Sequence, residues 1–532
     1  MNKILTRSAV GLFKLLSSGE RRGFLAAIKN PASAQNALLR DLLKSHAQTE
    51  YGRIYGLNPR CSREEFRNRV PIVSFDEGAL AYWIDRQFRS PNSAVLSPGG
   101  AEMFEKTSGS SGPHKLIPYN RELKRSFERY FKIWASDLLT HGPSLESFRI
   151  FISISPAFRT EEEKSKRVGL DDDSEYLSPL LRMIFKRFLS VPLNLKNEAD
   201  PVRFRDLLCA HLASDPALEI VSIWHPSFLD SVWQNLRERR NEIADLIVEM
   251  NLGKNRESRA RTVSILRSSA ALMPSALWPK LKIISSWDSA ASSMGARSVS
   301  RRFKPVLFQG KGLLATEAPM TIPLIGSGNV PFITDVLFEF RDEQGKLHWL
   351  DQIQSGKKYS LIISQKGGLL RYDMKDQVRV SSIDANGLPT LEFQGRAGDC
   401  SDLVGEKLTS GYLSSIEKDL VEELGETTYC MVPDSGDPAK DRAPSYIVLY
   451  DSPIEEARMA DWWEGRLSAS HHYSYSRKIG QLSAVRSRRV PLLSRRLLDH
   501  YASSRRMKLG DIKLKNLVSE SSEAEALLRD LL

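Results

Sequence analysis

A run of small residues followed by a lysine constrains the fold of this chain more than any other feature. Residues 107–118 read Thr-Ser-Gly-Ser-Ser-Gly-Pro-His-Lys-Leu-Ile-Pro, and the first six are all Gly, Ser or Thr. Small residues let the backbone approach an anion, hydroxyl groups add hydrogen-bond donors, and the lysine adds a positive charge. The run is therefore predicted to be a polyphosphate-binding loop, with a solvated Gly/Ser turn as the alternative.

The residues around this run exclude one common type of phosphate loop. A Walker A loop requires Gly-x-x-x-x-Gly-Lys-Ser/Thr and leads from a strand into a helix. Here the two glycines are too close together, and no Ser or Thr follows the lysine. Pro118 disfavours helix at Ile117, whereas Asn120 is a good N-cap for a helix that runs to about Leu139. The pattern is strand–loop–strand, which argues against a P-loop NTPase.

Composition sets the broad class of the protein. The chain has 532 residues, 41% of them hydrophobic and 27% charged, which is ordinary for a globular protein too long for one core. It contains no apolar run long enough for a transmembrane span. The cysteines Cys61, Cys209, Cys400 and Cys430 are far apart, so they predict neither a disulfide framework nor a metal site. We therefore expect a reduced, cytoplasmic protein.

The net charge of +11 does not by itself indicate nucleic-acid binding. The 76 basic residues are dispersed among 65 acidic ones, so a solvated surface is favoured over a nucleic-acid site. The charge also suits an anionic cosubstrate. No partner macromolecule is predicted, and the oligomeric state is left unassigned.

The pattern of elements predicts an α/β protein with two domains. The first hundred residues are mostly helical, and strands then alternate with helices, including one helix from Pro226 to about Met250. From about Phe332 a run of short strands and Gly-containing turns predicts an antiparallel meander that forms a barrel-like subdomain. We expect a large N-terminal domain over 1–395, a hinge over 396–402 and a small α+β domain over 403–532. A strand pair is predicted near Tyr473–Val490.

Several segments, in order along the chain, resemble one family. The loop 107–118 resembles the first motif of the auxin-responsive acyl acid amido synthetases (the Gretchen Hagen family), a branch of the acyl-adenylate-forming superfamily. Residues 312–317, Gly-Leu-Leu-Ala-Thr-Glu, resemble the second motif. Residues 359–376 resemble the third, Gly-Leu-Tyr-Arg-Tyr-x-x-Gly-Asp. The resemblance extends over nearly the whole chain, and its C-terminal run is similar to that of bacterial members. It implies a firefly-luciferase-like architecture.

The chain departs from the family pattern at four positions. Leu370 replaces the usual Tyr of the third motif, Asp373 stands where Arg is common, and Lys375 stands where Gly is usual. In the second motif Ala318 follows the glutamate, where Gly or Cys is usual. All the acidic residues of the pattern are retained.

The resemblance implies ATP and Mg²⁺ as cofactors and assigns roles to individual residues. Glu317 would hold the Mg²⁺ ion and act in catalysis, and Thr316 would approach the α-phosphate. Asp376 would accept the ribose hydroxyls, and Arg396 would contact the ribose or a phosphate. Lys513 would stabilise the negative charge that develops during adenylation. The phosphates would be bound by Ser108, Gly109, Ser110, Ser111, Gly112 and Lys115.

Three of these residues also have a simpler interpretation. In isolation Glu317 is an exposed turn residue, Asp376 is a turn-forming aspartate and Lys513 is a surface charge.

The implied function is ATP-dependent conjugation of a small carboxylic acid to an amino acid through an acyl-adenylate. One alternative is an adenylate-forming ligase with a thiol acceptor such as coenzyme A. A second alternative is a non-catalytic basic binding protein.

Overall fold

The computed structural model describes residues 3–75, 79–106, 116–153, 168, 183, 186–198, 200–396, 400–436, 442–505 and 512–532. The chain divides into two compact units. Unit 1 comprises Met1–Ile223, Arg239–Ser285 and Pro305–Phe393, and unit 2 comprises Trp224–Glu238, Ser286–Lys304 and Gln394–Leu532. Unit 2 thus contains two segments that lie far from the C-terminal region in the sequence.

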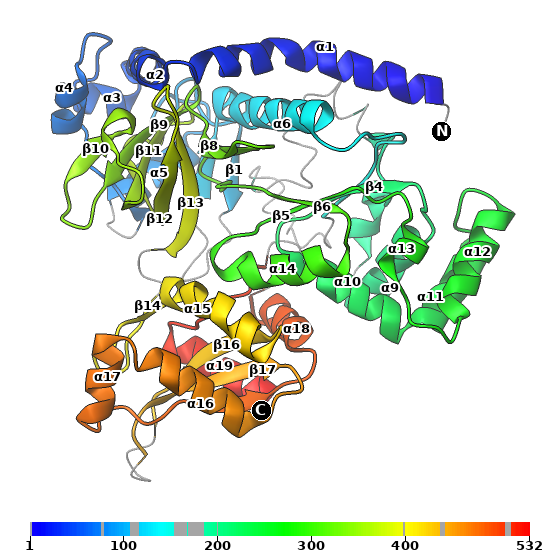
Figure 1. The fold of residues 1–532 in the computed structure, drawn as a ribbon. Helices are drawn as coiled ribbons and strands as arrows, with labels where there is room; N and C mark the ends of the chain where they lie inside the picture. The colour runs from blue at the N-terminus through cyan, green and yellow to red at the C-terminus, as the bar shows by residue number, and fades with distance from the viewer. Residues whose placement is uncertain are drawn as a thin grey trace. The chain divides into compact units, whose positions relative to one another are not determined.

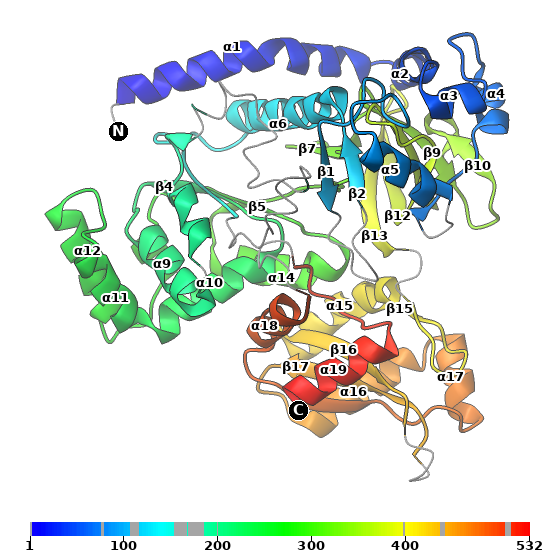
Figure 2. The ribbon, with the colours of Figure 1, turned by 180° about the vertical axis from the view of Figure 1, so that it is seen from behind.

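The N-terminal part of unit 1 is helical, as predicted. The long helix α1 lies beside α6 in both ribbon views (Figures 1 and 2). In α4 the Ser62 side chain accepts the Glu65 N–H, and the Glu65 carboxylate accepts the Ser62 N–H in return. The helices are α1 Lys3–Ala27, α2 Pro31–His46, α3 Glu50–Ile54, α4 Arg63–Arg69 and α5 Ala79–Arg89.

Two antiparallel strands flank the small-residue run. Strand β1 (Met103–Lys106) pairs with β2 (Leu116–Tyr119), with Lys106 opposite Leu116. Helix α6 (Arg121–His141) follows at once, and the Asn120 side chain accepts the Leu123 N–H at 2.8 Å. The strands predicted on either side of the run and the predicted helix start are both confirmed.

A four-stranded sheet and a group of helices complete the α/β part of unit 1. The strand order is β3-β4-β5-β6, and β3, β4 and β5 are parallel. The strands are β3 Arg149–Ile152, β4 Leu218–Ser222, β5 Ile283–Ser286 and β6 Leu307–Gly310. The helices are η3 Leu193–Asn197, α9 Pro201–Ala213, α11 Arg240–Glu249, α12 Arg256–Arg267 and α13 Pro274–Leu277.

The prediction of a single helix from Pro226 to about Met250 is wrong. The chain forms α10 (Pro226–Glu238) and α11, with Arg239 between them in a non-helical conformation (φ −114°, ψ 31°). The Arg239 guanidinium donates to the Asp206 carboxylate, with Nη2 2.9 Å from Oδ2. Because this ion pair lies within unit 1 whereas α10 belongs to unit 2, the break marks the point where the chain passes between the units.

The predicted meander forms a five-stranded antiparallel sheet with the order β10-β9-β11-β12-β13. Gln35 of α2 ties this sheet to the N-terminal helices. Its amide nitrogen donates to the Ile333 and Val336 carbonyls, and its oxygen accepts the Phe338 N–H, each at 2.9 Å. The elements are β7 Thr321–Leu324, β8 Gly328–Pro331, β9 Val336–Arg341, β10 Leu347–Trp349, η5 Leu350–Gln352, β11 Lys358–Gln365, β12 Tyr372–Ile383 and β13 Pro389–Arg396.

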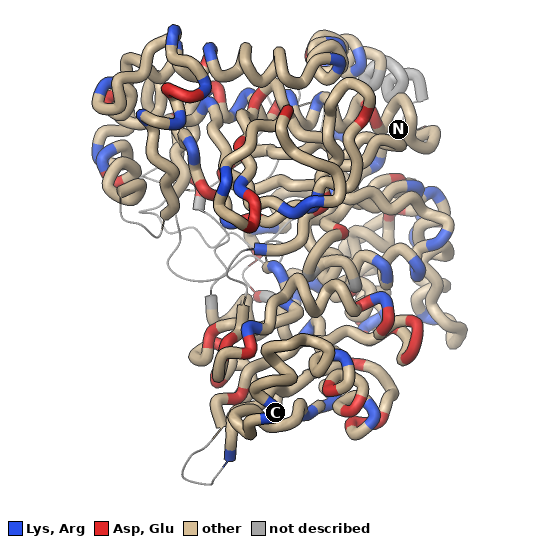
Figure 3. The backbone as a smooth tube through the Cα atoms, turned by 60° about the vertical axis from the view of Figure 1, so that its left-hand side comes forward, with Lys and Arg blue, Asp and Glu red and all other residues tan. Residues whose placement is uncertain are grey.

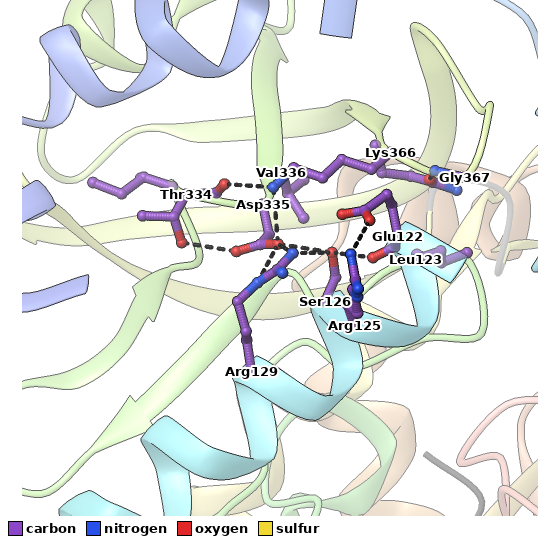
Figure 4. A network of polar contacts seen from close by, with 12 residues as sticks. Glu122, Leu123, Arg125, Ser126, Arg129, Thr334, Asp335, Val336, Lys366 and Gly367 are labelled. Atoms are coloured by element: carbon purple, nitrogen blue, oxygen red, sulfur yellow. Dashed lines mark hydrogen bonds and ion pairs between the residues drawn. The ribbon is translucent and has the colours of Figure 1, made fainter. Parts of the chain in front are cut away.

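A buried aspartate joins α6 to this sheet (Figure 4). Asp335, just before β9, is 1% exposed and accepts hydrogen bonds from Ser126 (2.7 Å) and Thr334 (2.9 Å). Arg129 and Lys366 form ion pairs with the same carboxylate. Burial raises the pKa of Asp335, but the two cations and the hydrogen bonds outweigh it and hold the pKa below its usual value.

A buried ion pair joins α4 to the same sheet. The guanidinium of Arg371 donates to both carboxylate oxygens of Glu339, at 2.8 and 3.1 Å, and these residues are 4% and 2% exposed. Arg371 Nη1 also donates to the carbonyls of Arg67 and Val70, at 2.7 and 2.6 Å. The arginine therefore fixes the last turn of α4 against β9 and satisfies most of its own donors.

Unit 2 is an α+β structure around the sheet β16-β17-β18. Strands β16 and β17 are antiparallel, and β18 is parallel to β17. The Met431 N–H donates to the Asn516 carbonyl, and the Val518 N–H donates to the Met431 carbonyl, both at 2.9 Å, so residues 516–518 extend the sheet beside β16.

The elements of unit 2 are the following. The helices are α10, η4 Ala290–Ser292, α14 Ser293–Arg302, α15 Ser410–Leu424, α16 Glu456–Leu467, α17 His471–Lys478, α18 Leu493–Arg505 and α19 Ser521–Leu531. The strands are β14 Cys400–Ser401, β15 Leu408–Thr409, β16 Thr428–Asp434, β17 Ser445–Asp451 and β18 Arg486–Arg489.

The strand pair predicted near Tyr473–Val490 is wrong, because its first half is the helix α17 and only β18 is a strand. Tyr473 and Ser476 are the buried residues of α17, while Tyr475 is 58% exposed. This spacing of three follows the helical period and not the alternation of a strand.

The predicted α/β architecture, with a larger N-terminal and a smaller C-terminal part, is confirmed. Within the described ranges, every helix is too short or too polar to span a lipid bilayer.

We expect Asp335→Asn to lower the free energy of unfolding by about 3 kcal/mol at pH 7, because it leaves the half-buried cations of Arg129 and Lys366 facing a neutral group. The folded-state pKa of Asp335 lies below the unfolded value of 3.8, so its contribution is present above that pH and is lost as the pH falls through the folded pKa. Denaturant titrations of both proteins should therefore show the difference at pH 7 and a smaller difference below pH 3.8.

Asp351→Asn is the matched control, because Asp351 pairs with Arg63 at 2.9 Å but is 38% exposed. We expect a change of less than about 1 kcal/mol there. An equal loss in both variants would contradict the role of the buried network.

Candidate functional site

Two adjacent residues at the end of β2 connect the three motifs predicted to form the site. The Tyr119 hydroxyl donates to the Thr316 carbonyl at 2.6 Å, and the Asn120 amide donates to the Lys366 carbonyl at 2.8 Å. Tyr119 is fully buried and Asn120 is 2% exposed. The strand that follows the small-residue run is thus bonded to the turn of the second motif and to the turn within the third.

The second motif forms a tight turn between β6 and β7. Leu314 and Pro319 pair across it, and the Ala315 N–H donates to the Ala318 carbonyl at 3.2 Å. Thr316 and Glu317 occupy its tip. Glu317 is 5% exposed, and no described residue gives its carboxylate a hydrogen bond or ion pair. A buried carboxylate without a partner is costly, so Glu317 could hold a cation and does not fit the interpretation as an exposed turn residue.

The third motif contains two adjacent glycines that the packing requires. Gly368 has φ +124°, and a Cβ there would lie 2.7 Å from the Leu96 carbonyl oxygen. A Cβ on Gly367 would lie 2.8 Å from Leu123 Cδ2, and the Gly367 carbonyl accepts a hydrogen bond from the Ser97 hydroxyl. The turn between β11 and β12 therefore packs directly on the segment before β1 and on the start of α6.

Lys375, which stands where the family has glycine, adopts a backbone conformation that favours glycine. Lys375 has φ +58°. The Asp373 carboxylate accepts the Lys375 N–H at 2.9 Å and forms an ion pair with its amine at 3.4 Å. Asp373, another departure from the family, thus supports the unusual conformation. Asp376 follows within β12 itself, where its side chain is 7% exposed.

Lys513 and Arg396 both belong to unit 2. Arg396 is half-buried and ends β13. Lys513 is exposed, and its amine lies 4.4 Å from the centroid of the Trp287 ring, a cation–π contact. The Trp287 ring lies 5.4 Å from that of Trp224, and the Trp287 N–H donates to the Trp224 carbonyl at 2.9 Å.

The segment that carries Lys513 is anchored by a buried asparagine. Asn516 is 4% exposed, and its amide donates to the Ser410 carbonyl (3.2 Å) and the Ser414 hydroxyl (2.9 Å) of α15. The neighbouring Glu417 accepts from Tyr429 at 3.1 Å and pairs with Arg297 of α14 at 3.0 Å. Burial raises the pKa of Glu417 despite these partners. Polar contacts thus join three separate parts of unit 2 around the Lys513 segment.

The predicted site residues fall into three groups. Thr316, Glu317 and Asp376 lie in unit 1, where Tyr119 and Asn120 bind the turns that carry the second and third motifs. Lys513 lies in unit 2 beside Trp287. The phosphate-loop residues Ser108, Gly109, Ser110, Ser111, Gly112 and Lys115 lie outside the described residues, between β1 and β2.

Sequence reasoning missed the connecting roles of Tyr119 and Asn120. The only sequence signal was the preference of Asn for an N-cap, which predicts the contact of its oxygen and not that of its amide nitrogen. Among the described residues no cluster of three or more His, Cys, Asp or Glu side chains could hold a metal ion.

Two family models match this chain. The GH3 family N-terminal domain matches residues 20–306, and the GH3 family central domain matches residues 330–396. The second model covers the five-stranded sheet and the third motif.

Curated relatives and a solved structure agree with these matches. The jasmonoyl–L-amino acid synthetase JAR6 of Nicotiana attenuata is 24% identical over 418 residues, which cover 69% of this chain and 70% of JAR6. The indole-3-acetic acid-amido synthetase GH3.3 of Arabidopsis thaliana is 21% identical over 471 residues, which cover 79% and 77%. The structure of the acyl acid amido synthetase AtGH3.15 in complex with 2,4-DB matches with a TM-score of 0.80 and 17% identity, covering 100% of this chain and 97% of that chain. The fold is therefore shared over both units.

We expect Gly368→Ala to lower the free energy of unfolding by at least about 2 kcal/mol, because the added Cβ meets the Leu96 carbonyl and the positive φ is strained for alanine. Denaturant titration measures the loss. The control is Gly465→Ala in α16, where a Cβ meets nothing within 4 Å and should stabilise by about 0.5–1 kcal/mol. Two changes of the same sign would show that the close approach to Leu96 is misassigned.

We expect Asn516→Ala to lower the free energy of unfolding by about 2 kcal/mol, because it removes the two hydrogen bonds that the buried Asn516 amide donates to α15. The measurement is again a denaturant titration. Asn386→Ala, in an exposed turn, is the control and should change stability by less than about 0.5 kcal/mol. A neutral Asn516→Ala would mean that the Lys513 segment is held by its backbone contacts alone.

Proposed function

Because the chain belongs to the GH3 family, we propose that it is an ATP-dependent acyl acid amido synthetase. In the first half-reaction a substrate carboxylate oxygen attacks the α-phosphorus of ATP, and pyrophosphate leaves. In the second, an amino acid amine attacks the acyl carbon, AMP leaves with the bonding electron pair, and the amine loses a proton. The product is an amide.

The observation that carries this proposal is the junction at Tyr119 and Asn120. These residues bond the strand after the small-residue run to the turn holding Thr316 and Glu317 and to the turn that leads to Asp376. A polyphosphate loop, an acidic residue for a cation and an acidic residue for a ribose are the groups that nucleotide activation requires. The names of the curated relatives point to the same chemistry.

Within this proposal each residue has a defined task. The hydroxyls and N–H groups of 108–112, with Lys115, bind the phosphates of ATP. Glu317 holds Mg²⁺, which supplies positive charge to the phosphate oxygens, and Thr316 approaches the α-phosphate. Asp376 accepts hydrogen bonds from the ribose hydroxyls, and Arg396 contacts the ribose or a phosphate. Lys513 stabilises the negative charge of the adenylation transition state.

We also propose that residues 396–402 form a hinge between a domain of residues 1–395 and a mobile domain of residues 403–532. A change of orientation about this hinge would exchange Lys513 for the amine acceptor between the half-reactions. The C-terminal segment of unit 2 begins at Gln394, close to this boundary, which supports the proposal. The four free cysteines suit a reducing compartment such as the cytoplasm.

The charge distribution gives no support to the nucleic-acid alternative. Figure 3 shows basic and acidic positions interspersed along the described backbone instead of basic positions gathered on one element. A nucleic-acid site uses a continuous basic surface.

The test of the proposed function is acid-dependent ATP–pyrophosphate exchange with Mg²⁺ and a panel of aromatic, indole and fatty carboxylic acids. We expect exchange with at least one acid, and an amide product when pooled amino acids are added. A thioester formed with coenzyme A, and no amide, would favour the thiol-acceptor alternative. The absence of exchange across the panel, together with the absence of ATP binding, would overturn the proposal.

We expect Lys513→Ala to lower the exchange rate by about 10²-fold, because it removes a charge aimed at the transition state, while ATP binding measured by titration stays close to that of the wild type. Lys418→Ala is the matched control, since Lys418 is an 80% exposed lysine of the same unit. Near-normal exchange by the Lys513 variant would exclude the assigned role.

A further inference from the structure

The long N-terminal helix α1 exposes apolar side chains on one face. Leu12 and Leu16 are 42% and 40% exposed. A different face packs on the rest of unit 1, where Ser17 is fully buried and the buried Phe24 ring lies 5.8 Å from the ring of Phe332. In both ribbon views α1 runs along the edge of unit 1, with α6 on its inner side (Figures 1 and 2). The leucine face is therefore open to a partner.

The residues of this face follow the spacing of a helix–helix seam. Apolar or small residues recur along α1 at alternating intervals of four and three, which keeps them on one side of a helix. On a helical wheel their mean direction is about 130° from that of Ser17 and Phe24. These positions, named here the α1 seam, are Leu5, Ala9, Leu12, Leu16, Gly19, Gly23 and Ala26.

Two glycines of the α1 seam have no packing reason within the described part of the protein. Gly19 and Gly23 lie in the interior of α1, and both are exposed. A Cβ at either position would meet no atom of the described residues within 4 Å. Glycine is among the least favourable residues in a helix interior, so both weaken α1 without a gain in packing. Glycines four residues apart do, however, let a second helix approach this face closely.

We propose that the α1 seam binds the α1 seam of a second copy of this chain in an antiparallel pair. Leucines predominate in the first half of the seam, whereas its second half is glycine and alanine. Leu16 is the centre, so an antiparallel copy that shares this centre places Leu12 of one copy opposite Gly19 of the other. Large side chains of each copy then fill the space above small residues of the other.

The size pattern of the seam selects this partner and this orientation. A parallel copy would set glycine against glycine and leucine against leucine, and no single separation of two helices packs both halves. The antiparallel pair is two-fold symmetric, which is the commonest symmetry of homodimers. No position of the seam is charged, so the contact buries no charge.

The size of the contact sets its strength. The seam is about 33 Å long and a helix is about 10–12 Å wide, so each copy contributes a projected area of roughly 350 Å². Interdigitating side chains add to this area, but the total stays at the low end of specific interfaces, which bury about 1,200–2,000 Å². We therefore expect a reversible dimer with a Kd in the micromolar range.

Sedimentation velocity of the full chain tests the pair. Between about 1 and 200 μM, which brackets a micromolar Kd, we expect a shift from monomer to dimer. Gly19→Glu puts a carboxylate into the seam but improves the helix propensity of α1. It should raise the Kd at least about tenfold without lowering the temperature of unfolding. Monomer across the whole range overturns the proposal, as does a Gly19→Glu protein whose Kd stays within about twofold of the wild type.

Gly11→Glu is the matched control. Gly11 is another exposed glycine of α1 whose Cβ would meet no described atom within 4 Å, but it lies outside the seam. The change in charge and in helix propensity is the same, so the Kd should stay within about twofold of the wild type. An equal loss in both variants would assign the effect to the added charge and overturn the pair. Acid-dependent exchange should be unchanged in both, because no residue assigned to the site lies on α1.

Cysteine cross-linking checks the orientation. Under mild oxidation, a mixture of the Leu12→Cys and Gly19→Cys proteins should form a disulfide-linked dimer of the two, whereas Leu12→Cys alone should not. The wild type gives the background from the native cysteines, of which Cys61, Cys209 and Cys430 are buried. Cross-linking of Leu12→Cys with itself, and none in the mixture, would show a parallel pair and overturn the proposal.

A lipid surface is the other partner that exposed leucines on a basic helix fit. Flotation with vesicles of phosphatidylcholine and phosphatidylglycerol distinguishes it from a second copy. Dimer formation in solution supports the pair, with or without vesicle binding. Monomer at every concentration, together with vesicle binding that Gly19→Glu abolishes, overturns the pair and assigns the seam to the membrane.

Discussion

The hydroxyl of Tyr119 and the amide of Asn120 are the contacts on which the arrangement of unit 1 depends. They occupy consecutive positions at the end of β2, and each reaches a carbonyl about two hundred residues or more further along the chain. Asn120 also starts α6 through its side-chain oxygen. One dipeptide thus sets the direction of a helix and the positions of the turns of the second and third motifs. Carbonyl acceptors in turns lack the repeated partners of helices and strands, so side-chain donors of this kind have a large influence on their geometry.

Buried charges hold the sheets and helices of unit 1 in register. Asp335 is surrounded by two cations and two hydroxyls between α6 and β9 (Figure 4), and Arg371 spans from Glu339 to the end of α4. Such pairs add little net stability relative to apolar residues, because their desolvation offsets the attraction. Their geometry is selective, however, since a shifted helix would leave a charge unpaired. We infer that they position the N-terminal helices and α6 around the turn that leads to Asp376.

Unit 2 joins residues from three distant parts of the chain. The turn at Trp224–His225, the segment beginning at Ser286 and the C-terminal region meet around Lys513, and Asn516 and Glu417 provide the polar contacts that hold them. This explains why the helix in the segment Trp224–Glu238 is buried on most sides, although the segment follows a strand of unit 1. A lysine held on an indole ring keeps its charge near low-dielectric surroundings, where charge stabilisation is strongest.

The sequence alone determined the features that depend on neighbouring residues. The Asn120 cap, the strands on either side of the small-residue run, the antiparallel sheet that includes β9 to β13 and the order of the three motifs were all predicted, because periodicity, capping and turn preferences act over a few residues. The tertiary structure decided the rest. It made α17 a helix although Tyr473 and Tyr475 alternate as in a strand, it divided the helix after Pro226 at Arg239, and it left Glu317 and His225 Nε2 buried without partners among the described residues. These outcomes depend on which surfaces meet across hundreds of residues, and that information is carried by packing in three dimensions and not by local sequence.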